Sequence, residues 1–229
     1  MKLIVFDVDG TLVDSQHVIV ATVQTAFAYF GLPAPTDDAI RRIVGLPLVD
    51  GLARLAPTLD PAGIDALARA YRDGFQAARV APDLPETLFP GVRAMLEALA
   101  AAGFQLGVAT GKSRRGLLAV LEHHQLMPFF ITLQTGDVPP GKPHPAMLLR
   151  AIDEAGVAPE EAAMIGDTTF DIAMARAAGA LAVGVAWGYH PADELIAAGA
   201  THLVASSAEI APLFAALASR AISPPSQPS

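Results

Sequence analysis

The chain has 229 residues, 52% of them apolar, a formal net charge of −8 and no cysteine. This length suits one large domain or a core with a smaller insert, and the acidic balance disfavours a nucleic-acid partner because it repels the phosphate backbone. Without cysteine there is no disulfide, thiolate nucleophile or cysteine-bound zinc. No apolar run approaches the roughly 18 residues that cross a bilayer, and the first residues lack the apolar stretch of a signal peptide. We therefore expect a cytoplasmic protein without membrane contacts.

Short apolar runs predict the strands of a sheet. The first, residues 2–8, is rich in branched side chains, and similar runs follow at 104–110, 129–134, 162–167, 180–186 and 201–204. Between them, apolar residues at three- and four-residue spacing predict helices at 91–103, 145–156 and 168–179, each of which ends at a glycine. Strands that alternate with helices of about a dozen residues indicate an α/β fold with a doubly wound parallel sheet.

One region interrupts this alternation. Residues 15–31, 36–45 and 61–79 have helical patterns with no convincing strand among them, and Ser15 is the expected N-cap of the first. We expect a helical insert at 15–86, with hinges near 14–16 and 81–90, in a core made of 1–14 and 87–222. The tail 223–229, "SPPSQPS", has the composition of a disordered segment.

Polar residues gather where the predicted strands end. Asp7 and Asp9 follow the first strand, Thr110-Gly111-Lys112 the second, "GKPHP" (141–145) the third, and Asp167 the fourth, with Asp171 four residues later. In open parallel sheets, ligands bind beyond the carboxyl ends of the strands. The pattern therefore predicts one site to which several loops contribute.

The acids of this site would repel one another. Asp7, Asp9, Asp167 and Asp171 bring four negative charges together, against the one positive charge of Lys142, and crowded carboxylates raise each other's pKa. A hard divalent cation with oxygen ligands resolves this conflict, and Mg²⁺ is the expected ion because it shares its coordination with a substrate phosphate.

The remaining groups suit phosphoryl transfer, in which catalysis is mostly positioning and charge neutralisation. One aspartate can attack phosphorus to form an aspartyl-phosphate, and a second can protonate the leaving oxygen and then activate water. The Thr110 hydroxyl and the Gly111 N–H can donate to phosphate oxygens, and Lys142 can neutralise the phosphoryl group.

Four motifs carry a resemblance to the haloacid dehalogenase-like superfamily, and specifically to its phosphatases with a helical cap. "DVDGT" (7–11) matches the first motif, "VATGK" (108–112) the second, "GKPHP" (141–145) the third and "GDTTFD" (166–171) the fourth. Their order and spacing agree over about residues 1–220. The resemblance implies a Rossmann-like core with the first strand central and a mobile cap, for which the insert 15–86 has the right place.

The resemblance also implies residue roles. Asp7 would be the nucleophile and a Mg²⁺ ligand, and Asp9 the general acid/base, with its backbone carbonyl on the metal. Thr110 and Lys142 would be catalytic residues that hold the phosphoryl group. Asp167 would bind Mg²⁺, and Asp171 would act on the metal indirectly or through water. Many relatives have Asn where this chain has Gly111, which leaves the local phosphate contacts open.

Two features narrow the chemistry that the resemblance implies. Relatives that dehalogenate lack an acid at position 9, so Asp9 favours phosphate esters. Relatives that cleave phosphonates use a cap lysine, and residues 15–86 contain none. With the looser matches "VGLP" (44–47) and "WGY" (187–189), the chain most resembles the phosphoglycolate phosphatase-like group. The expected partner is a small phosphorylated metabolite, and the oligomeric state, monomer or dimer, stays open.

Simpler interpretations stand beside these. Lys112 is expected to be a solvated neighbour, and Asp171 could merely stabilise a helix N-terminus. The histidines at 123, 124, 144, 190 and 202 are expected at the surface or in loops. One cap arginine among Arg41, Arg42, Arg72 and Arg79 could bind a substrate carboxylate, although all four are expected to be solvated.

Two alternative functions remain. A phosphosugar mutase would share the core but move the phosphoryl group between hydroxyls. A non-hydrolytic phospho-acceptor regulator would also combine acids, Thr and Lys on a parallel sheet, although the insert of about 70 residues and the pair Asp7 and Asp9 disfavour it.

Overall fold

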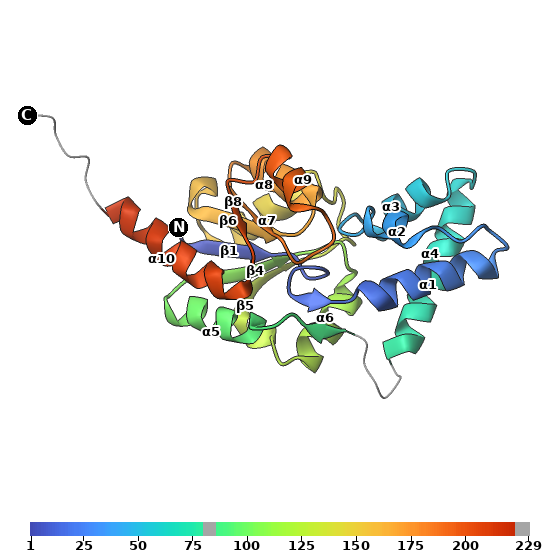
Figure 1. Cartoon of the computed structure of the whole chain (residues 1–229), viewed down its shortest axis with the longest axis horizontal. Helices are drawn as coiled ribbons and strands as arrows, with labels where there is room; N and C mark the ends of the chain where they lie inside the picture. The colour runs from blue at the N-terminus through green and yellow to red at the C-terminus, as the bar shows by residue number, and fades with distance from the viewer. Residues whose placement is uncertain (80–85, 223–229) are drawn as a thin grey trace, which may run out of the picture.

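The core is one parallel sheet. The computed structural model describes residues 1–79 and 86–222 (Figure 1), and within them six strands pair in the order β5-β4-β1-β6-β7-β8. Their bounds are β1 Leu3–Phe6, β4 Gln105–Ala109, β5 Phe130–Gln134, β6 Ala162–Gly166, β7 Leu181–Val185 and β8 His202–Val204. All five pairings are parallel, and β1 lies inside the sheet between β4 and β6. The predicted α/β class is confirmed.

Helices cover both faces of the sheet, so its strands are buried on both sides. On one face, Ile4 and Phe6 of β1 pack in a core with the helices α5 Val92–Ala101, α6 Arg114–His123 and α10 Ile210–Ile222. On the other, Leu3 and Val5 pack with α7 Ala146–Ala155, α8 Thr169–Ala178 and α9 Ala192–Ala197. This two-sided burial explains why β1 is apolar at every position rather than at alternate ones.

The insert after β1 is helical, as predicted, and it has its own hydrophobic core. It contains α1 Gln16–Tyr29, α2 Asp37–Arg41, α3 Leu48–Leu55 and α4 Pro61–Arg79, and lies to one side of the sheet in Figure 1. Val23, Phe27, Ile40, Leu52 and Leu67 fill a hydrophobic cluster separate from the two clusters of the core. We call α1–α4 the cap. Its third helix, α3, is not among the predicted elements, and α2 ends at Arg41, four residues short of the predicted 36–45.

A two-stranded antiparallel ribbon joins the chain segments at the base of the cap. Val13–Asp14 (β2), before α1, pairs with Thr87–Leu88 (β3), after α4. Neither strand was predicted. Part of the predicted hinge 81–90 and the predicted disordered tail 223–229 lie outside the described residues.

Three one-turn 3₁₀ helices, Met127–Phe129, Pro159–Glu161 and Ser207–Glu209, precede β5, β6 and α10. Within 1–79 and 86–222, no helix combines the length and the apolarity needed to cross a membrane.

Candidate active site

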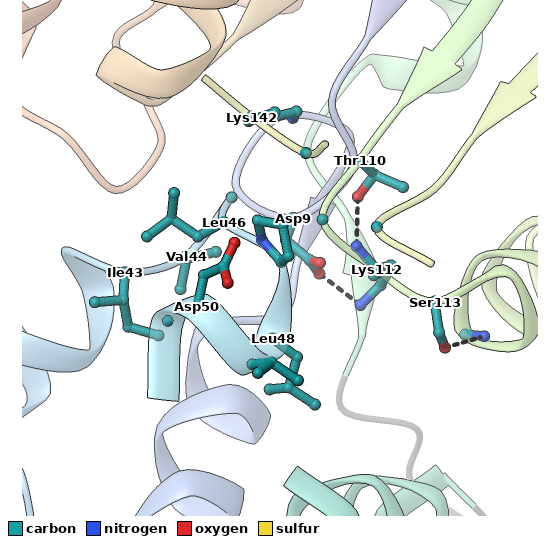
Figure 2. Close-up of a pocket in the computed structure, with 18 of the residues that line it drawn as sticks. Asp9, Ile43, Val44, Leu46, Leu48, Asp50, Thr110, Lys112, Ser113 and Lys142 are labelled. Carbon is teal, nitrogen blue, oxygen red and sulfur yellow. Dashed lines mark hydrogen bonds and ion pairs between the residues drawn. The ribbon is translucent and has the colours of Figure 1, made fainter. Parts of the chain in front are cut away.

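The predicted site residues meet at the carboxyl edge of the sheet. Asp7 follows β1, Thr110 follows β4, Asp167 follows β6, and Lys142 lies in the loop between β5 and α7. With Asp9, all but Asp167 line a cavity of about 920 Å³, to which cap residues such as Leu46 and Leu48 also contribute (Figure 2). Since parallel strands end at the same edge, loops far apart in sequence supply one site.

Three carboxylates form a compact buried cluster. One oxygen from each of Asp7, Asp167 and Asp171 lies within 4.8 Å of the others, and none of the three residues is more than 1% exposed. Lys142, itself 2% exposed, places its Nζ 2.9 Å from Asp7 Oδ1 and 2.6 Å from Asp171 Oδ1. Lys142 therefore lies among three buried acids rather than the four that were predicted, because Asp9 pairs with Lys112 instead.

The charge imbalance shifts the pKa values in this cluster. Burial raises the pKa of Asp7 to about 7, against the opposing effect of Lys142. Burial, followed by repulsion from Asp7 and Asp171, raises the pKa of Asp167 well above its ordinary value. Burial works against the charge of Lys142, but Asp171 and Asp7 outweigh it and raise the pKa of the lysine. The site as described lacks positive charge.

Asp167 is held in place by both of its oxygens. The Thr11 hydroxyl donates to Oδ1 at 2.8 Å, and the Tyr189 backbone N–H donates to Oδ2 at 2.9 Å. Gly10 of the first motif makes this approach possible: its φ is +83°, and a Cβ there would lie 2.2 Å from Asp167 Oδ2. The glycine in "DVDGT" thus allows the first loop to pack against the fourth.

Asp171 both caps a helix and faces Lys142. Its Oδ2 accepts hydrogen bonds from the backbone N–H of Thr168 at 3.0 Å and from the Thr168 hydroxyl at 2.7 Å, which closes a capping box at the start of α8. Its Oδ1 faces Lys142. Asp171 therefore stabilises the start of α8 and also lies in the buried acid cluster.

The donor set fits a hard divalent cation. Among the described residues, Asp7 Oδ1 faces only Lys142 and Asp7 Oδ2 has no hydrogen-bond donor, although both oxygens are buried. Buried carboxylate oxygens without donors are costly. Oxygen ligands from Asp7 and Asp167 match the preference of Mg²⁺, which completes its coordination with water and phosphate.

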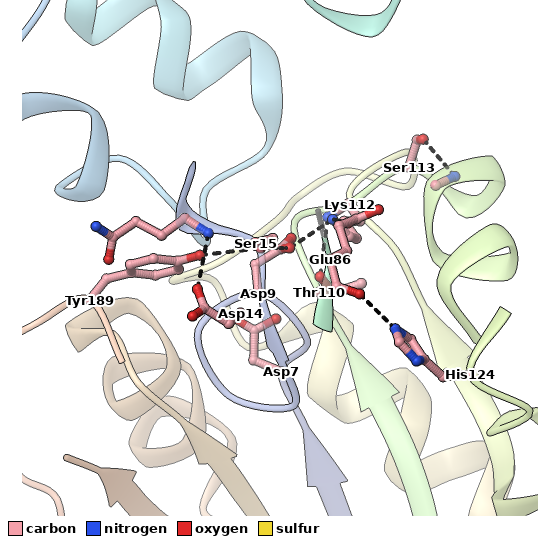
Figure 3. Close-up of polar contacts among 12 residues, drawn as sticks. Asp7, Asp9, Asp14, Ser15, Glu86, Thr110, Lys112, Ser113, His124 and Tyr189 are labelled. Atoms are coloured by element: carbon pink, nitrogen blue, oxygen red, sulfur yellow. Dashed lines mark hydrogen bonds and ion pairs between the residues drawn. The ribbon is translucent and has the colours of Figure 1, made fainter. Parts of the chain in front are cut away.

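Asp9 lies in a different network (Figure 3). The Lys112 Nζ is 2.7 Å from Asp9 Oδ1 and 3.0 Å from Glu86 Oε1, and the Ser15 hydroxyl also donates to Asp9 Oδ1. Because the single proton of Ser15 goes to Asp9, the Tyr189 hydroxyl, 3.2 Å away, donates to Ser15. Burial raises the pKa of that tyrosine, which keeps it protonated.

This network corrects one expectation and refines another. The Lys112 side chain is only 9% exposed and pairs with two acids, so it is not a solvated neighbour. Ser15 is the N-cap residue of α1, as predicted, but its side chain accepts no capping hydrogen bond, and its hydroxyl donates to Asp9 instead. Glu86 was missed because no motif marks it, and Tyr189 lies in the match "WGY" (187–189), which predicted no role for it.

Thr110 and Gly111 form the loop after β4. Thr110 is 1% exposed, and its hydroxyl oxygen accepts a hydrogen bond from the backbone N–H of Lys112 at 3.2 Å. Because the oxygen serves here as an acceptor, the hydroxyl proton is left for another group. Both residues line the cavity.

His190 is not a surface residue: it is 5% exposed, and its Nδ1 accepts the Thr169 backbone N–H at 3.2 Å. Desolvation by burial, followed by the charge of Arg42, lowers its pKa. His124 is also partly buried, and its Nε2 lies 2.8 Å from the backbone carbonyl of Glu86.

The four cap arginines named in the sequence analysis have different surroundings. Arg41 pairs with Asp38 at 2.6 Å, and Arg42 pairs with Glu194 of α9, across the boundary between cap and core. Arg72 lines the cavity. The structure does not describe the side chain of Arg79.

A parallel sheet, a helical cap inserted after its first strand and an acid cluster between them define a capped α/β enzyme with an acidic site. The sequence profile described as haloacid dehalogenase-like hydrolase matches residues 4–185. The chain belongs to this family, which confirms the resemblance that the four motifs carry.

Relatives of known class agree with this assignment. The chain is 38% identical over 210 residues to "Probable phosphatase IndB" of Dickeya dadantii, covering 91% of each chain. It is 36% identical over 193 residues to "Phosphoglycolate phosphatase" of Pseudomonas syringae, covering 82% of this chain and 71% of the relative. The predicted enzyme class, a phosphatase, is confirmed.

A solved structure shows the same architecture. A haloacid dehalogenase-like family hydrolase from Streptococcus pneumoniae superposes with a TM-score of 0.81 at 27% identity, covering 93% of this chain and 98% of that one.

Proposed function

We propose that the protein hydrolyses a small phosphomonoester with Mg²⁺, through a phosphoryl group carried on Asp7. The observation that carries this proposal is the environment of Asp7: a buried carboxylate at the end of the central strand, paired with Lys142 through Oδ1 and close to two further acids. Its Oδ2 has no hydrogen-bond donor among the described residues, which leaves its lone pairs for phosphorus or for a metal.

The reaction divides into two displacements on phosphorus. Asp7 attacks the phosphorus, the bond to the ester oxygen breaks, and Asp9 supplies the proton that leaves with the alcohol. Water then attacks the phosphorus of the aspartyl-phosphate, Asp9 takes a proton from that water, and inorganic phosphate leaves Asp7 in its original state.

Three groups would hold the phosphoryl oxygens. The Thr110 hydroxyl and the Gly111 backbone N–H are the donors of the loop after β4, and Lys142 supplies the positive charge. Lys142 already contacts Asp7 at 2.9 Å, so a phosphoryl group on Asp7 would form within its reach.

Mg²⁺ would be held by the carboxylates of Asp7 and Asp167 and by the backbone carbonyl of Asp9. Bound there, it would neutralise charge on the phosphoryl group. Asp171 would act through water or by orienting its neighbours, because its two oxygens are engaged with Thr168 and Lys142.

The first substrate to test is 2-phosphoglycolate, the substrate named for the Pseudomonas syringae relative. The cavity of about 920 Å³ falls at the upper end of the range of about 300–1,000 Å³ for small-molecule sites. The assay should therefore include larger phosphomonoesters. Of Arg41, Arg42, Arg72 and Arg79, Arg72 is the described residue that lines the cavity, and it could bind a carboxylate.

The test measures phosphate release from a panel of phosphorylated metabolites, with and without Mg²⁺. Release that requires the metal and is lost in Asp7→Asn supports the proposal. A mutase would instead yield an isomeric phosphate ester, and a phospho-acceptor would retain a phosphorylated Asp7 for many minutes without turnover. Either result would replace the proposal.

The domain boundaries belong to the same proposal. We assign 15–86 to the cap and 1–14 with 87–222 to the catalytic core. The ribbon between β2 and β3 supports these limits, since it pairs the residues on either side of the insert.

A further inference from the structure

Lys112 connects the proposed general acid/base to the cap. Its ammonium lies 2.7 Å from Asp9 Oδ1 in the core and 3.0 Å from Glu86 Oε1, just before β3 (Figure 3). It also lies 5.0 Å from the centre of the Phe75 ring on α4, a cation–π distance. One side chain thus contacts the catalytic loop, a cap helix and the segment that returns from the cap.

Both partners of Asp9 bind the same oxygen. Lys112 and Ser15 each donate to Oδ1, and no residue in the described parts of the chain donates to Oδ2. Asp9 lines the cavity. Asp9 Oδ2 is therefore the oxygen that can exchange a proton with a substrate oxygen. The contacts on Oδ1 fix the orientation of the carboxylate for this exchange.

The charged groups of Lys112, Asp9 and Glu86 are buried, so each depends on the others as partners. The Glu86 side chain is 0% exposed, and those of Lys112 and Asp9 are 9% and 10% exposed. Buried charges require close partners, and removing one partner leaves the others poorly compensated. The Glu86 backbone is also tied, since His124 Nε2 donates to its carbonyl at 2.8 Å. Lys112 is consequently placed by the base of the cap.

We infer that Lys112 is a positioning residue that aligns the Asp9 carboxylate for proton transfer by joining it to Glu86 and Phe75. The inference rests on the proposed function, because it assigns a helper to Asp9 in that reaction. It also gives a role to the contact between core and cap: the acid is aligned where the cap helix returns to the core.

The test compares two leaving groups. An alkyl phosphate needs a proton on its leaving oxygen, whereas p-nitrophenyl phosphate leaves as a stable anion. General acid–base catalysis contributes about 10²–10⁴-fold, so Lys112→Met should lower kcat/KM for the alkyl substrate at least about tenfold and for p-nitrophenyl phosphate less than about threefold. Asp9→Asn should show the same selectivity more strongly. The alkyl probe is 2-phosphoglycolate or whichever alkyl phosphate in the panel gives the highest wild-type kcat/KM.

Matched variants separate positioning from damage to the fold. Lys112→Arg keeps the charge and should restore most of the alkyl activity. Glu86→Gln should shift the ratio of the two kcat/KM values in the same direction, and adding it to Lys112→Met should cost little more, because the two side chains act as one unit. Lys2→Met is the control: it breaks the ion pair of Lys2 with Glu161, 2.9 Å long, outside the site.

The outcomes are distinct. The inference is overturned if Lys112→Met leaves the ratio of the two kcat/KM values unchanged, which includes an equal loss with both substrates. If Lys112→Met does not fold, Glu86→Gln decides instead: an unchanged ratio in that variant also overturns the inference. If the wild-type protein releases no phosphate from either substrate with Mg²⁺, the proposed function itself has failed.

Discussion

The backbone carbonyl oxygen of Leu46 in the cap occupies the space that a side chain on Gly111 of the core would need. A Cβ at Gly111 would lie 2.5 Å from that oxygen and 2.9 Å from the carbonyl oxygen of Gly45. A similar limit applies at Gly141, where a Cβ would lie 2.3 Å from the Pro47 ring. Glycine at 111 therefore allows the cap loop to lie directly on the loop after β4.

A side chain at position 111 should displace the cap loop. Overpacking typically costs about 1–3 kcal/mol, so Gly111→Ala and Gly111→Asn should raise KM by about tenfold, with the larger effect for Asn. Steady-state kinetics on the best substrate will measure this. Gly74→Ala is the control, because its Cβ would meet only a Thr22 methyl at 3.3 Å. A lower KM in Gly111→Asn would show that the family's common residue is tolerated here.

Asp7→Asn should abolish turnover. The amide is a poor nucleophile, and loss of the nucleophile in a concerted site costs on the order of 10⁶-fold in kcat. Circular dichroism should show an unchanged fold, because the amide has nearly the same volume as the carboxylate. Asp14→Asn, on β2 at the base of the cap, serves as the control and should remain active. Retained activity in Asp7→Asn would refute its assignment as the nucleophile.

Mg²⁺ affinity should rise with pH. In the metal-free protein the pKa of Asp7 is raised to about 7, so below that pH the metal must displace a proton, whereas above it the carboxylate is already ionised. Calorimetric titration with MgCl₂ at pH 5.5 and pH 8 should give tighter binding at pH 8 and proton release at pH 5.5. EDTA should stop turnover and added Mg²⁺ should restore it. Equal affinity at the two pH values would contradict the raised pKa.

His190 should make the protein less stable in mild acid. Its pKa is lowered in the folded state, chiefly by burial, whereas the unfolded chain has the ordinary value of 6.5. The unfolded state therefore binds more protons below that pH, and the stability present above pH 6.5 is lost as pH falls through the folded pKa. Thermal unfolding between pH 7.5 and pH 5 will measure the slope.

The matched pair for this measurement is His190→Asn and His144→Gln. Asn can keep the acceptor for the Thr169 N–H without a group that titrates in this range, so Tm should fall less between pH 7.5 and pH 5. His144 is exposed, and its replacement should leave the slope unchanged. A steeper slope in His190→Asn would show that other groups dominate the acid response.

Local patterns in the sequence account for much of the fold. Each predicted strand contains the observed one, as 2–8 contains β1, because buried parallel strands are apolar throughout. Glycine caps locate the ends of α7 and α8, where Gly156 and Gly179 have positive φ values. The helices α3, α6, α9 and α10 are not among the predicted elements.

Sequence patterns likewise account for only some of the residues of the site. Asp7, Asp167, Asp171 and Lys142 follow from motifs and from the geometry of parallel strand ends. The network of Asp9 does not, because its members lie far apart in sequence: Lys112 is 103 residues from Asp9 and 26 from Glu86. Their pairing depends on how the cap returns to the core, which no local period encodes.

The ribbon of β2 and β3 restricts how the cap can be displaced. The two crossings between core and cap are hydrogen-bonded to each other as antiparallel strands, Val13 with Leu88 and Asp14 with Thr87. Two unpaired connections would allow the cap to rotate freely, whereas this pairing couples them. If the cap is displaced, we expect it to bend about the ribbon, with the smallest shift near Asp9, which bridges to Val13.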